Sequence, residues 1–388
     1  MRFSFVLFAL VPAMAVAQGG PVEQGPRNVP EFRPAFTAQT RAPAEDSGVT
    51  LRREVFASGL AHPWGIAPLP QGGYLVTERP GRMRRILPDG SLSAPIAGLP
   101  EVLAESQGGL LDVTLGPDFE TDRMIYWTYA KPMRGGRSAT AAARGVLAPD
   151  LSRVSAVEDI FVQSPPSHAP AHYGSRILFG PDGHVFITTG EHFTPQERVL
   201  AQDTDTTYGK VVRIRPDGSI PPDNPFGNAV WSYGHRNPQG AAFDSSGRLW
   251  TVEHGPAGGD ELNRPEAAEN HGWPVISYGE NYDGDPVGSG RAVAEGMEQP
   301  VYYWDPVIAP GGMTFYDGAM FDAWRGDALI ASLSPGGLVR LSLQDGRVTG
   351  EERFLRGTRI RDVEIAPDGA VLVLVDAPEG EILRLTPQ

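Results

Sequence analysis

One hairpin pattern recurs six times along this chain of 388 residues, and it restricts the fold more than any other feature. Each copy has a short apolar strand, a turn of the Pro-Asp-Gly kind, and a second strand rich in Val, Ile, Leu and aromatic residues. The copies occupy residues 65–78, 111–129, 176–191, 240–253, 312–333 and 362–376. They start roughly 45 to 75 residues apart, which is close to the period of a four-stranded blade. We therefore predict an all-β fold, a six-bladed β-propeller, over residues 49–388.

Two other all-β arrangements, a pair of β-sandwiches or two small barrels, could also contain several hairpins. Six copies of one template favour radial symmetry over either. A closed ring also needs a complete last blade, and the strand expected at 51–57 can finish a blade begun near the C-terminus. Helical patterning is scarce, and the Ala-rich stretch 139–143 is the only weak candidate. A parallel α/β fold is therefore not expected.

The first 17 residues have the pattern of a signal peptide. Arg2 supplies the positive charge, residues 3–16 form a short apolar run, and Ala15-Val16-Ala17 fits the cleavage pattern. A retained membrane anchor is the alternative, but no stop-transfer segment follows. We expect a periplasmic or secreted protein with no membrane insertion after cleavage. Residues 18–48, rich in Pro and Gly, are expected to be an extended or disordered lead-in.

Composition excludes several classes of partner and cofactor. The formal net charge is -14, and no block of Lys and Arg offsets it. Nucleic acids and anionic membranes bind positive surfaces, so neither is an expected partner. The chain has no Cys, which excludes disulfides, iron–sulfur clusters, thiolate zinc sites and covalently attached haem. No G-x-G-x-x-G pattern joins a strand to a helix, which disfavours nicotinamide. Redox chemistry would need another non-covalent organic cofactor, or a metal bound by oxygen and nitrogen.

The densest polar cluster lies in residues 231–273, in the segments WSYGHRNPQG, EHGPAGGDELN and NHGWP. Each segment contains Gly and follows an expected strand, where the loops of a propeller form binding sites. Gly255 and Pro256 can present carbonyl oxygens without obstruction, and Asp260, Glu261 and Asn263 add hard oxygen donors. Ca²⁺ prefers such ligands, although the spacing is not that of an EF-hand.

His172 lies just before an expected strand, in HAPAHYGSRILFGPDG. A histidine placed there could take a proton from a bound alcohol near neutral pH. His168 and His172 also have the spacing of a two-histidine metal site, but Pro166 and Pro170 disfavour the helix that such a site requires. A lone general base is the stronger hypothesis, and a structural histidine is the alternative.

Three further side chains indicate an acidic ligand. Arg359 and Arg361 are two residues apart at the start of a strand, so both guanidinium groups can face one carboxylate-bearing ligand. Gln107 precedes another strand, in SQGGLLDV. A simple ion pair between Arg361 and Asp362 is the alternative for that arginine.

The segments QGGLLDV, HYGSR, GHRNPQG, EHGPAGGDELN, NHGWP and RIRDV occur in the order found in the glucose/sorbosone dehydrogenase family. The chain resembles in particular the bacterial aldose sugar dehydrogenases that use pyrroloquinoline quinone (PQQ). Each motif alone is weak, but the combination is specific and spans nearly the whole chain after the lead-in. The resemblance implies oxidation of the C1 hydroxyl of an aldose sugar to the lactone, with transfer of electrons to an external acceptor.

The resemblance also implies roles for individual residues. His172 is the implied base for the anomeric hydroxyl. Arg236, with Asn237 beside it, is implied to stabilise negative charge on the quinone oxygen. The side chains implied to hold PQQ are Gln107, Arg236, Asn237, Arg359 and Arg361.

The same resemblance implies two calcium ions. The carbonyls of Gly255 and Pro256 would bind a catalytic Ca²⁺, and Glu261 with the carbonyl of His271 a structural one. The chain departs from the family in two places. Ser334 stands at or near a position where a Lys is usual, which would weaken the binding of PQQ. His271 replaces a common Tyr, which should matter little if only its carbonyl binds.

Two rival functions remain open at this point. A calcium-dependent lactonase can also use a six-bladed propeller with an axial metal, but two arginines directed at one point exceed what a small neutral lactone needs. A propeller that binds a glycan or a protein partner without catalysis would need only a concave polar face.

Overall fold

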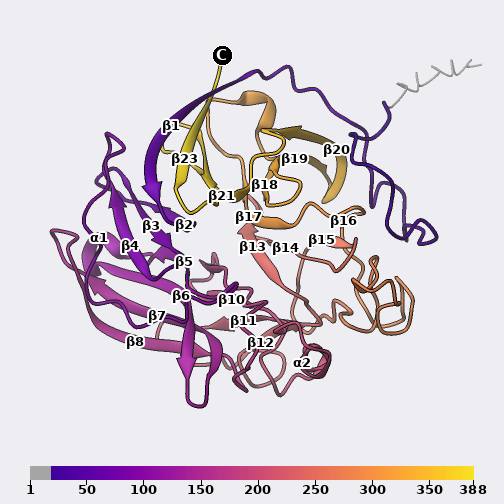
Figure 1. The fold of residues 1–388 in the computed structure, drawn as a ribbon, viewed down its shortest axis with the longest axis horizontal. Helices are drawn as coiled ribbons and strands as arrows, with labels where there is room; N and C mark the ends of the chain where they lie inside the picture. Colours follow the sequence, from indigo (N-terminus) through magenta and orange to yellow (C-terminus); the bar gives the residue numbers. More distant parts are fainter. Residues whose placement is uncertain (1–18) are drawn as a thin grey trace, which may run out of the picture.

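The computed structural model describes residues 19–388, which form six sheets around a central axis (Figure 1). The predicted signal peptide, residues 1–17, lies outside the described residues. Neighbouring sheets contact each other through their innermost strands, in the cyclic order β2, β5, β9, β13, β17, β21 and back to β2. The prediction of a six-bladed β-propeller is confirmed.

The blades are numbered here in chain order. Blade 1 contains β2 (Pro63–Pro68), β3 (Tyr74–Glu78) and β4 (Arg82–Ile86). Blade 2 contains β5 (Leu110–Leu115), β6 (Met124–Met133), β7 (Arg137–Leu147) and β8 (Val154–Val162). Blade 3 contains β9 (Ile177–Phe179), β10 (Val185–Thr189), β11 (Lys210–Ile214) and β12 (Val230–Tyr233).

Blade 4 contains β13 (Pro238–Phe243), β14 (Leu249–Glu253), β15 (Asp260–Asn263) and β16 (Tyr302–Trp304). Blade 5 contains β17 (Pro310–Phe315), β18 (Ala328–Ser332), β19 (Gly337–Gln344) and β20 (Arg347–Phe354). Blade 6 contains β21 (Ile360–Ile365), β22 (Val371–Val375), β23 (Gly380–Pro387) and β1 (Leu51–Leu60). The described helices are single turns: α1 (Phe119–Asp122), α2 (Pro195–Arg198), and the 3₁₀ turns η1 (Val199–Gln202) and η2 (Asp322–Trp324). None of the helices in residues 19–388 has the length and apolar character to cross a bilayer.

The six predicted hairpins are the two inner strands of the six blades, from β2–β3 in blade 1 to β21–β22 in blade 6. The weak helix candidate at 139–143 was wrong, because these residues lie inside β7. Ala142 packs toward blade 3, whereas Ala141 and Ala143 pack toward blade 1. Burial on both faces of a sheet overrides the helical preference of Ala.

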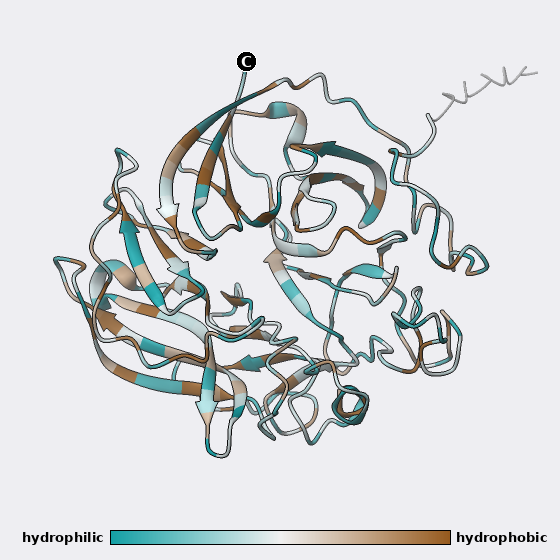
Figure 2. Ribbon diagram, viewed as in Figure 1, coloured by the Kyte–Doolittle hydropathy of each residue, from teal (hydrophilic) through white to brown (hydrophobic). Residues whose placement is uncertain are grey.

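The hydrophobic core lies between adjacent blades. Each blade-to-blade interface has its own cluster, such as Leu75 with Trp127 between blades 1 and 2, and Trp250 with Ile330 between blades 4 and 5. Figure 2 shows the resulting hydrophobic bands along the strands. Because both faces of a blade are buried in this way, the six sheets form one continuous ring of packed layers.

The ring is closed by the two ends of the propeller sequence. Strand β1 pairs antiparallel with β23, from Leu51 opposite Pro387 to Leu60 opposite Gly380. The expected completion of the last blade by a strand near residue 51 is confirmed. This pairing leaves blade 6 with four strands, and the outer edge of β23 is covered.

Residues 19–48, called the N-terminal strap below, form no strand and only isolated bridges. The strap follows the outer side of the ring past β16 and β20 before it enters β1 (Figure 1). Its Val29, Gln39 and Ala42 side chains are buried against the propeller. The sequence left an extended or a disordered lead-in open, and these residues are extended and packed.

Candidate active site

A cavity of ≈ 170 Å³ opens on the propeller axis, at the face where the inner strands begin. Asn237 precedes β13, and Arg361 lies at the start of β21. All six side chains proposed from the sequence for the base and the cofactor meet here. The lining residues are Trp64, Arg79, Gln107, His172, Arg236, Asn237, Gln239, His254, Tyr282, Leu333, Arg359 and Arg361.

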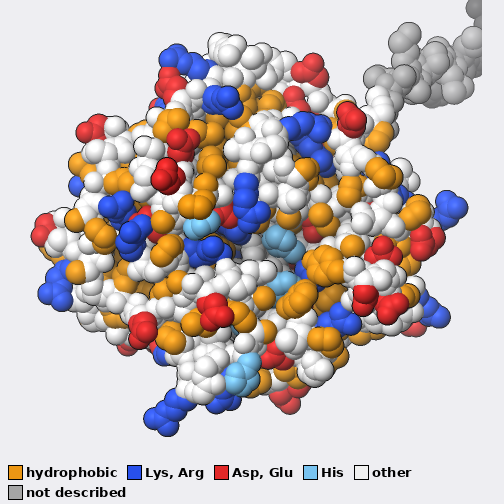
Figure 3. All heavy atoms as spheres, in the orientation of Figure 1, with side chains coloured by type: hydrophobic (Ala, Val, Ile, Leu, Met, Phe, Trp, Pro, Cys, Tyr) orange, Lys and Arg blue, Asp and Glu red, His pale blue; other side chains and the backbone are white. Residues whose placement is uncertain are grey.

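The cavity is positively charged in a chain with a net charge of -14. Four of its lining residues are arginines: Arg79, Arg236, Arg359 and Arg361. The lining contains neither Asp nor Glu. Figure 3 shows Lys or Arg and His side chains gathered around the hollow at the centre of this face. Such a field favours a ligand with several negative charges.

His172 has an unusual backbone conformation. Its φ is 46°, in the left-handed region that non-glycine residues seldom adopt. The backbone of Gly190 packs against His172, and any side chain at residue 190 would prevent this contact, because its Cβ would lie 1.9 Å from the carbonyl oxygen of His172. The backbone amide of His172 donates to Oε1 of Gln107 at 2.9 Å. Strained residues of this kind cluster at functional sites.

The ring of His172 is oriented by Glu191, which follows β10. Its Nδ1 lies 3.0 Å from Oε1 of Glu191, and both side chains are buried. Burial lowers the pKa of His172 well below its usual value, and the positive charge of Arg236 lowers it further. The imidazole is therefore neutral near pH 7. With Nδ1 directed at the carboxylate, Nε2 is the nitrogen that can accept a proton from a ligand.

The two strand-start arginines share one carboxylate. Nε of Arg359 and Nη2 of Arg361 lie 3.0 and 2.9 Å from Oδ2 of Asp376. Burial opposes ionisation of Asp376, but Arg361, His62 and Arg359 together lower its pKa below the usual value. Asp362 instead pairs with Arg176, so the simple pair between Arg361 and Asp362 is not formed. Asp376 thus fixes both guanidinium groups at the edge of the cavity.

Arg236 is almost fully buried at the cavity wall. Its Nη1 donates to the carbonyl oxygen of His254 at 3.0 Å, and its guanidinium lies 5.1 Å from the ring centre of Trp273. The side-chain oxygen of the adjacent Asn237 accepts from the amide of Gly174 at 3.0 Å. These contacts fix Arg236 and Asn237 at the wall of the cavity.

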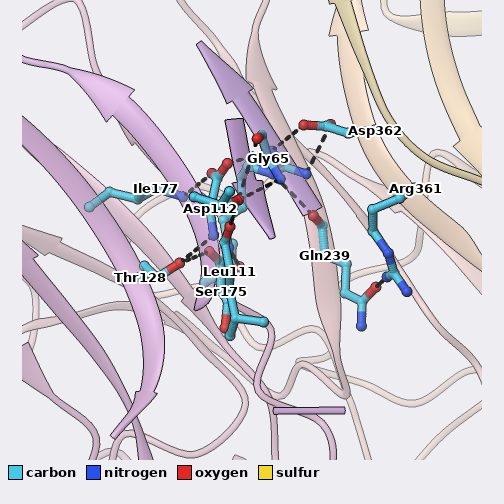
Figure 4. Close-up of polar contacts among 12 residues, drawn as sticks. Gly65, Leu111, Asp112, Thr128, Ser175, Ile177, Gln239, Arg361 and Asp362 are labelled. Atoms are coloured by element: carbon cyan, nitrogen blue, oxygen red, sulfur yellow. Dashed lines mark hydrogen bonds and ion pairs between the residues drawn. The ribbon is translucent and has the colours of Figure 1, made fainter. Parts of the chain in front are cut away.

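Below the cavity, buried ion pairs fill the axis (Figure 4). Arg176 of blade 3 bonds Asp112 of blade 2 at 2.8 Å and Asp362 of blade 6 at 3.1 Å. Gly65 lies beside Asp112, where a Cβ would come within 2.6 Å of Oδ1. The guanidinium of Arg176 also lies 4.9 Å from the ring centre of Trp64. This network links three blades and gives the cavity a fixed floor.

The donor set of the cavity fits PQQ, which offers carboxylate and quinone oxygens as acceptors. Three buried nitrogens on lining side chains have no hydrogen-bond partner within residues 19–388: His254 Nε2, Arg236 Nε and Arg361 Nε. A buried donor is costly without a partner, so an acceptor-rich ligand would remove this cost.

The loop with Gly255 and Pro256 lies next to the cavity. Gly255 follows the lining residue His254, and Pro256 lines an adjacent hollow together with Arg236 and Tyr282. Among the described residues no amide donates to the carbonyl oxygens of Gly255 or Pro256. Free carbonyl oxygens beside a quinone pocket fit a calcium ion.

Asp260 shapes this loop instead of offering a free carboxylate. Its Oδ1 accepts from the amide of Gly255 at 2.7 Å, and its Oδ2 accepts from the amides of Ile308 and Ala309 at 2.7 and 2.6 Å. The sequence suggested Asp260 as a metal ligand. Because both of its carboxylate oxygens already accept backbone hydrogen bonds, a role in holding the loop fits Asp260 better.

Glu261 and His271 lie in a second buried cluster, behind the cavity. Asn263 Nδ2 bridges Oε2 of Glu261 and Oε1 of Glu253, each at 3.0 Å. His235 bonds Glu253 at 2.9 Å and stacks on His271, with ring centres 4.4 Å apart. Burial raises the pKa of Glu261 well above its usual value, and the charge of Glu253 raises it further. A cation beside Glu261 would reverse this penalty.

Within residues 19–388, no group of three or more His, Cys, Asp or Glu side chains has the geometry of a metal site. The proposed calcium sites depend mainly on backbone carbonyls, which such groups do not include. His168 is exposed and His172 is buried, and the two do not share a helix. The two-histidine metal site, the weaker hypothesis from the sequence, is not formed.

Residues 60–384 match the family model described as Glucose / Sorbosone dehydrogenase. The chain belongs to the glucose/sorbosone dehydrogenase family. Membership makes it a dehydrogenase, as the sequence motifs predicted. A similar member of this family, the aldose sugar dehydrogenase YliI of Escherichia coli (strain K12), is 42% identical over 351 residues, which cover 87% of this chain and 94% of that protein.

Two solved structures show how closely the fold follows that of other family members. The soluble aldose sugar dehydrogenase from Escherichia coli, in its apo form, has a TM-score of 0.84 at 41% identity, covering 87% of this chain and 100% of that chain. The PQQ-bound form of the aldose sugar dehydrogenase from Streptomyces coelicolor has a TM-score of 0.75 at 29% identity, covering 89% and 100%.

Sequence reasoning missed several parts of this dehydrogenase site. Gln239 and His254 lie in motifs that were noted, and Trp64 directly precedes the first predicted hairpin, but their positions in the cavity were not foreseen. Glu191 was also missed, although it is the acidic residue at the end of the predicted hairpin 176–191, which begins just after His172. Ser334 is exposed and follows the lining residue Leu333, so a longer side chain at 334 starts close to the cavity.

Proposed function

We propose that this chain oxidises the C1 hydroxyl of aldose sugars to the lactone, with PQQ and Ca²⁺ as cofactors, and passes the electrons to an external acceptor. The observation that carries the proposal is the axial cavity, which combines four arginines, no lining carboxylate and a buried neutral His172. The PQQ-bound form of the Streptomyces coelicolor relative supports the choice of quinone.

In the proposed reaction, His172 Nε2 accepts the proton of the anomeric hydroxyl, and Glu191 holds the ring in the required tautomer. Arg236 and Asn237 stabilise negative charge that develops at the wall of the cavity. Gln107, Arg359 and Arg361 orient the cofactor by binding the carboxylates at its edge. When bound, PQQ would supply a two-electron acceptor for the hydride from sugar C1, and Ca²⁺ would polarise its C5 carbonyl as a Lewis acid.

Two calcium ions belong to the proposal. The carbonyls of Gly255 and Pro256 would hold the catalytic ion, and Glu261 with the carbonyl of His271 the structural one. The half-buried carboxylate of Glu261, which lies close to that of Glu253, supports the second site, because Ca²⁺ stabilises clustered carboxylates. We also propose that residues 1–17 direct export to the periplasm or the medium.

One reconstitution experiment separates this proposal from its rivals. Purified protein is treated with PQQ and Ca²⁺, and reduction of an artificial dye is followed after glucose is added. We expect dye reduction that requires both PQQ and the sugar. Hydrolysis of a lactone without PQQ would indicate the lactonase. Sugar binding without either reaction would indicate a non-enzymatic propeller.

A further inference from the structure

The N-terminal strap is anchored to the outer strand of blade 4 by one carboxylate. The backbone amides of Asn28 and Val29 donate to Oδ1 and Oδ2 of Asp305 at 2.7 and 3.0 Å. Asp305 directly follows β16 and is buried. Nη2 of Arg41 adds a bond to the carbonyl oxygen of the same residue at 2.9 Å. Both carboxylate oxygens and the carbonyl oxygen of Asp305 therefore bind the strap.

The other side of Asp305 touches the loop that carries Gly255 and Pro256. Gly258 has a φ of 85°, and a Cβ there would come within 2.8 Å of Oδ1 of Asp305. The same Cβ would lie 3.6 Å from Cβ of Asn28. The amide of Gly259 donates to the carbonyl oxygen of Trp304 at 2.8 Å. Loop 255–259 is thus packed against the strap and its anchor.

A second contact of the strap reaches the loop that ends at the mouth of the cavity. Gln39 is fully buried, and its Oε1 accepts from Tyr278 Oη at 3.0 Å while its Nε2 donates to the carbonyl oxygen of Pro300 at 2.9 Å. Tyr278 stacks on Tyr303 with ring centres 3.8 Å apart. Arg27 of the strap donates to Tyr303 Oη at 2.7 Å.

The two loops held by the strap are joined to each other. Ala257 and Glu280 form an antiparallel bridge, with amide-to-carbonyl distances of 2.9 and 3.1 Å. Two residues later, Tyr282 lines the cavity and its hydroxyl lies 3.4 Å from Nη2 of Arg236. A continuous set of contacts therefore runs from Asn28 and Gln39 to the wall of the cavity.

We infer that the first half of the strap, residues 27–39, is a positioning element that fixes loops 255–259 and 278–282 for the binding of metal and cofactor. The inference rests on the proposed function for the identity of the ligands, but the coupling of strap to loops does not. The strap lies outside residues 60–384, the part of the chain that matches the family model.

The second half of the strap provides a matched control. Glu45 pairs with Arg340 of β19 at 3.0 Å, and the amide of Ser47 donates to Glu352 of β20 at 3.1 Å. These contacts belong to blade 5 and do not touch either loop. The change Glu45→Gln removes one carboxylate from the strap attachment, as Asp305→Asn does at blade 4.

The test compares Asp305→Asn, Gln39→Leu and Glu45→Gln in the full chain. Amide hydrogen exchange of Ala257 and Glu280 reports on the loops without any ligand. Titration of metal-free protein with Ca²⁺, and then with PQQ, reports on binding. We expect faster exchange and about 10- to 100-fold weaker Ca²⁺ binding in the first two variants, as for residues that support metal ligands. Glu45→Gln should lower only the melting temperature.

Unchanged exchange and unchanged Ca²⁺ affinity in Asp305→Asn and Gln39→Leu would overturn the inference, even if both variants melt earlier. If either variant fails to fold, Arg27→Met replaces it, because that change removes one strap contact with Tyr303 and leaves Asp305 and Gln39 bonded. If the unaltered protein binds neither Ca²⁺ nor PQQ while exchange still rises in the variants, the proposed function fails and the coupling of strap to loops stands.

Discussion

Arg359 offers the sharpest test of how the cavity would bind an anionic cofactor. Its side chain is 50% exposed, and Asp376 keeps Arg361 and His62 as partners when Arg359 is changed to Gln. Loss of such an exposed pair costs less than about 1 kcal/mol of folding free energy. A charge-assisted bond to a carboxylate of PQQ contributes about 1.5 to 3 kcal/mol, which is about 10- to 150-fold in Kd. Binding should therefore change far more than stability.

The assay is a titration of Arg359→Gln with PQQ at fixed Ca²⁺, followed by fluorescence or calorimetry, together with a thermal melt. Arg384→Gln is the control, because Arg384 pairs with Asp368 in blade 6 and does not line the cavity, yet its loss changes the net charge equally. At physiological salt, screening over about 8 Å keeps that distant charge from affecting binding. Equal affinities of the two variants would refute the assignment of Arg359 to the cofactor.

Three other changes have defined outcomes. His172→Gln should leave PQQ binding nearly intact and reduce turnover by about 10² to 10⁴-fold; near-normal turnover in the reconstituted variant would remove His172 from this role. Exhaustive chelation should abolish activity and lower the melting temperature, because a metal that binds only the folded state stabilises it; no change in either would count against both calcium sites. Ser334→Lys should tighten PQQ binding by about tenfold or more, measured by the same titration; equal or weaker binding would mean that residue 334 does not face the cofactor.

The hairpins could be predicted because their turns are specified locally. Segments such as 181–183 place Pro, Asp and Gly between two apolar strands, and this chemistry acts without reference to the rest of the fold. Residues 139–143 could not be assigned in the same way. Their Ala side chains favour a helix in isolation, and only burial between two blades makes them a strand.

Several cavity residues could be located because they lie at or just before the start of an inner strand, and the inner strands surround the axis. Arg359 and Arg361 illustrate this, since their spacing fixes their side of the strand. Their shared partner Asp376 directly follows β22, the next strand of the same blade, and its role depends on a strand pairing that the sequence does not state. The attachment of the strap was harder still to predict, because Asn28 and Val29 bind Asp305 through backbone amides, which every residue except Pro has.

The pairing of β1 with β23 has a consequence for biosynthesis. The partner of Leu51 is Pro387, far along the chain, so β1 is made early and remains an unpaired edge until β23 has been synthesised. Contacts between residues this distant in sequence form slowly, and an unpaired strand edge is prone to pair with other chains. Five blades can assemble from local hairpins while the chain is still growing, but the ring cannot close before β23 has been made. Truncations that remove β23 should therefore trap an open, aggregating propeller, whereas changes before residue 51 leave the pairing of β1 with β23 intact.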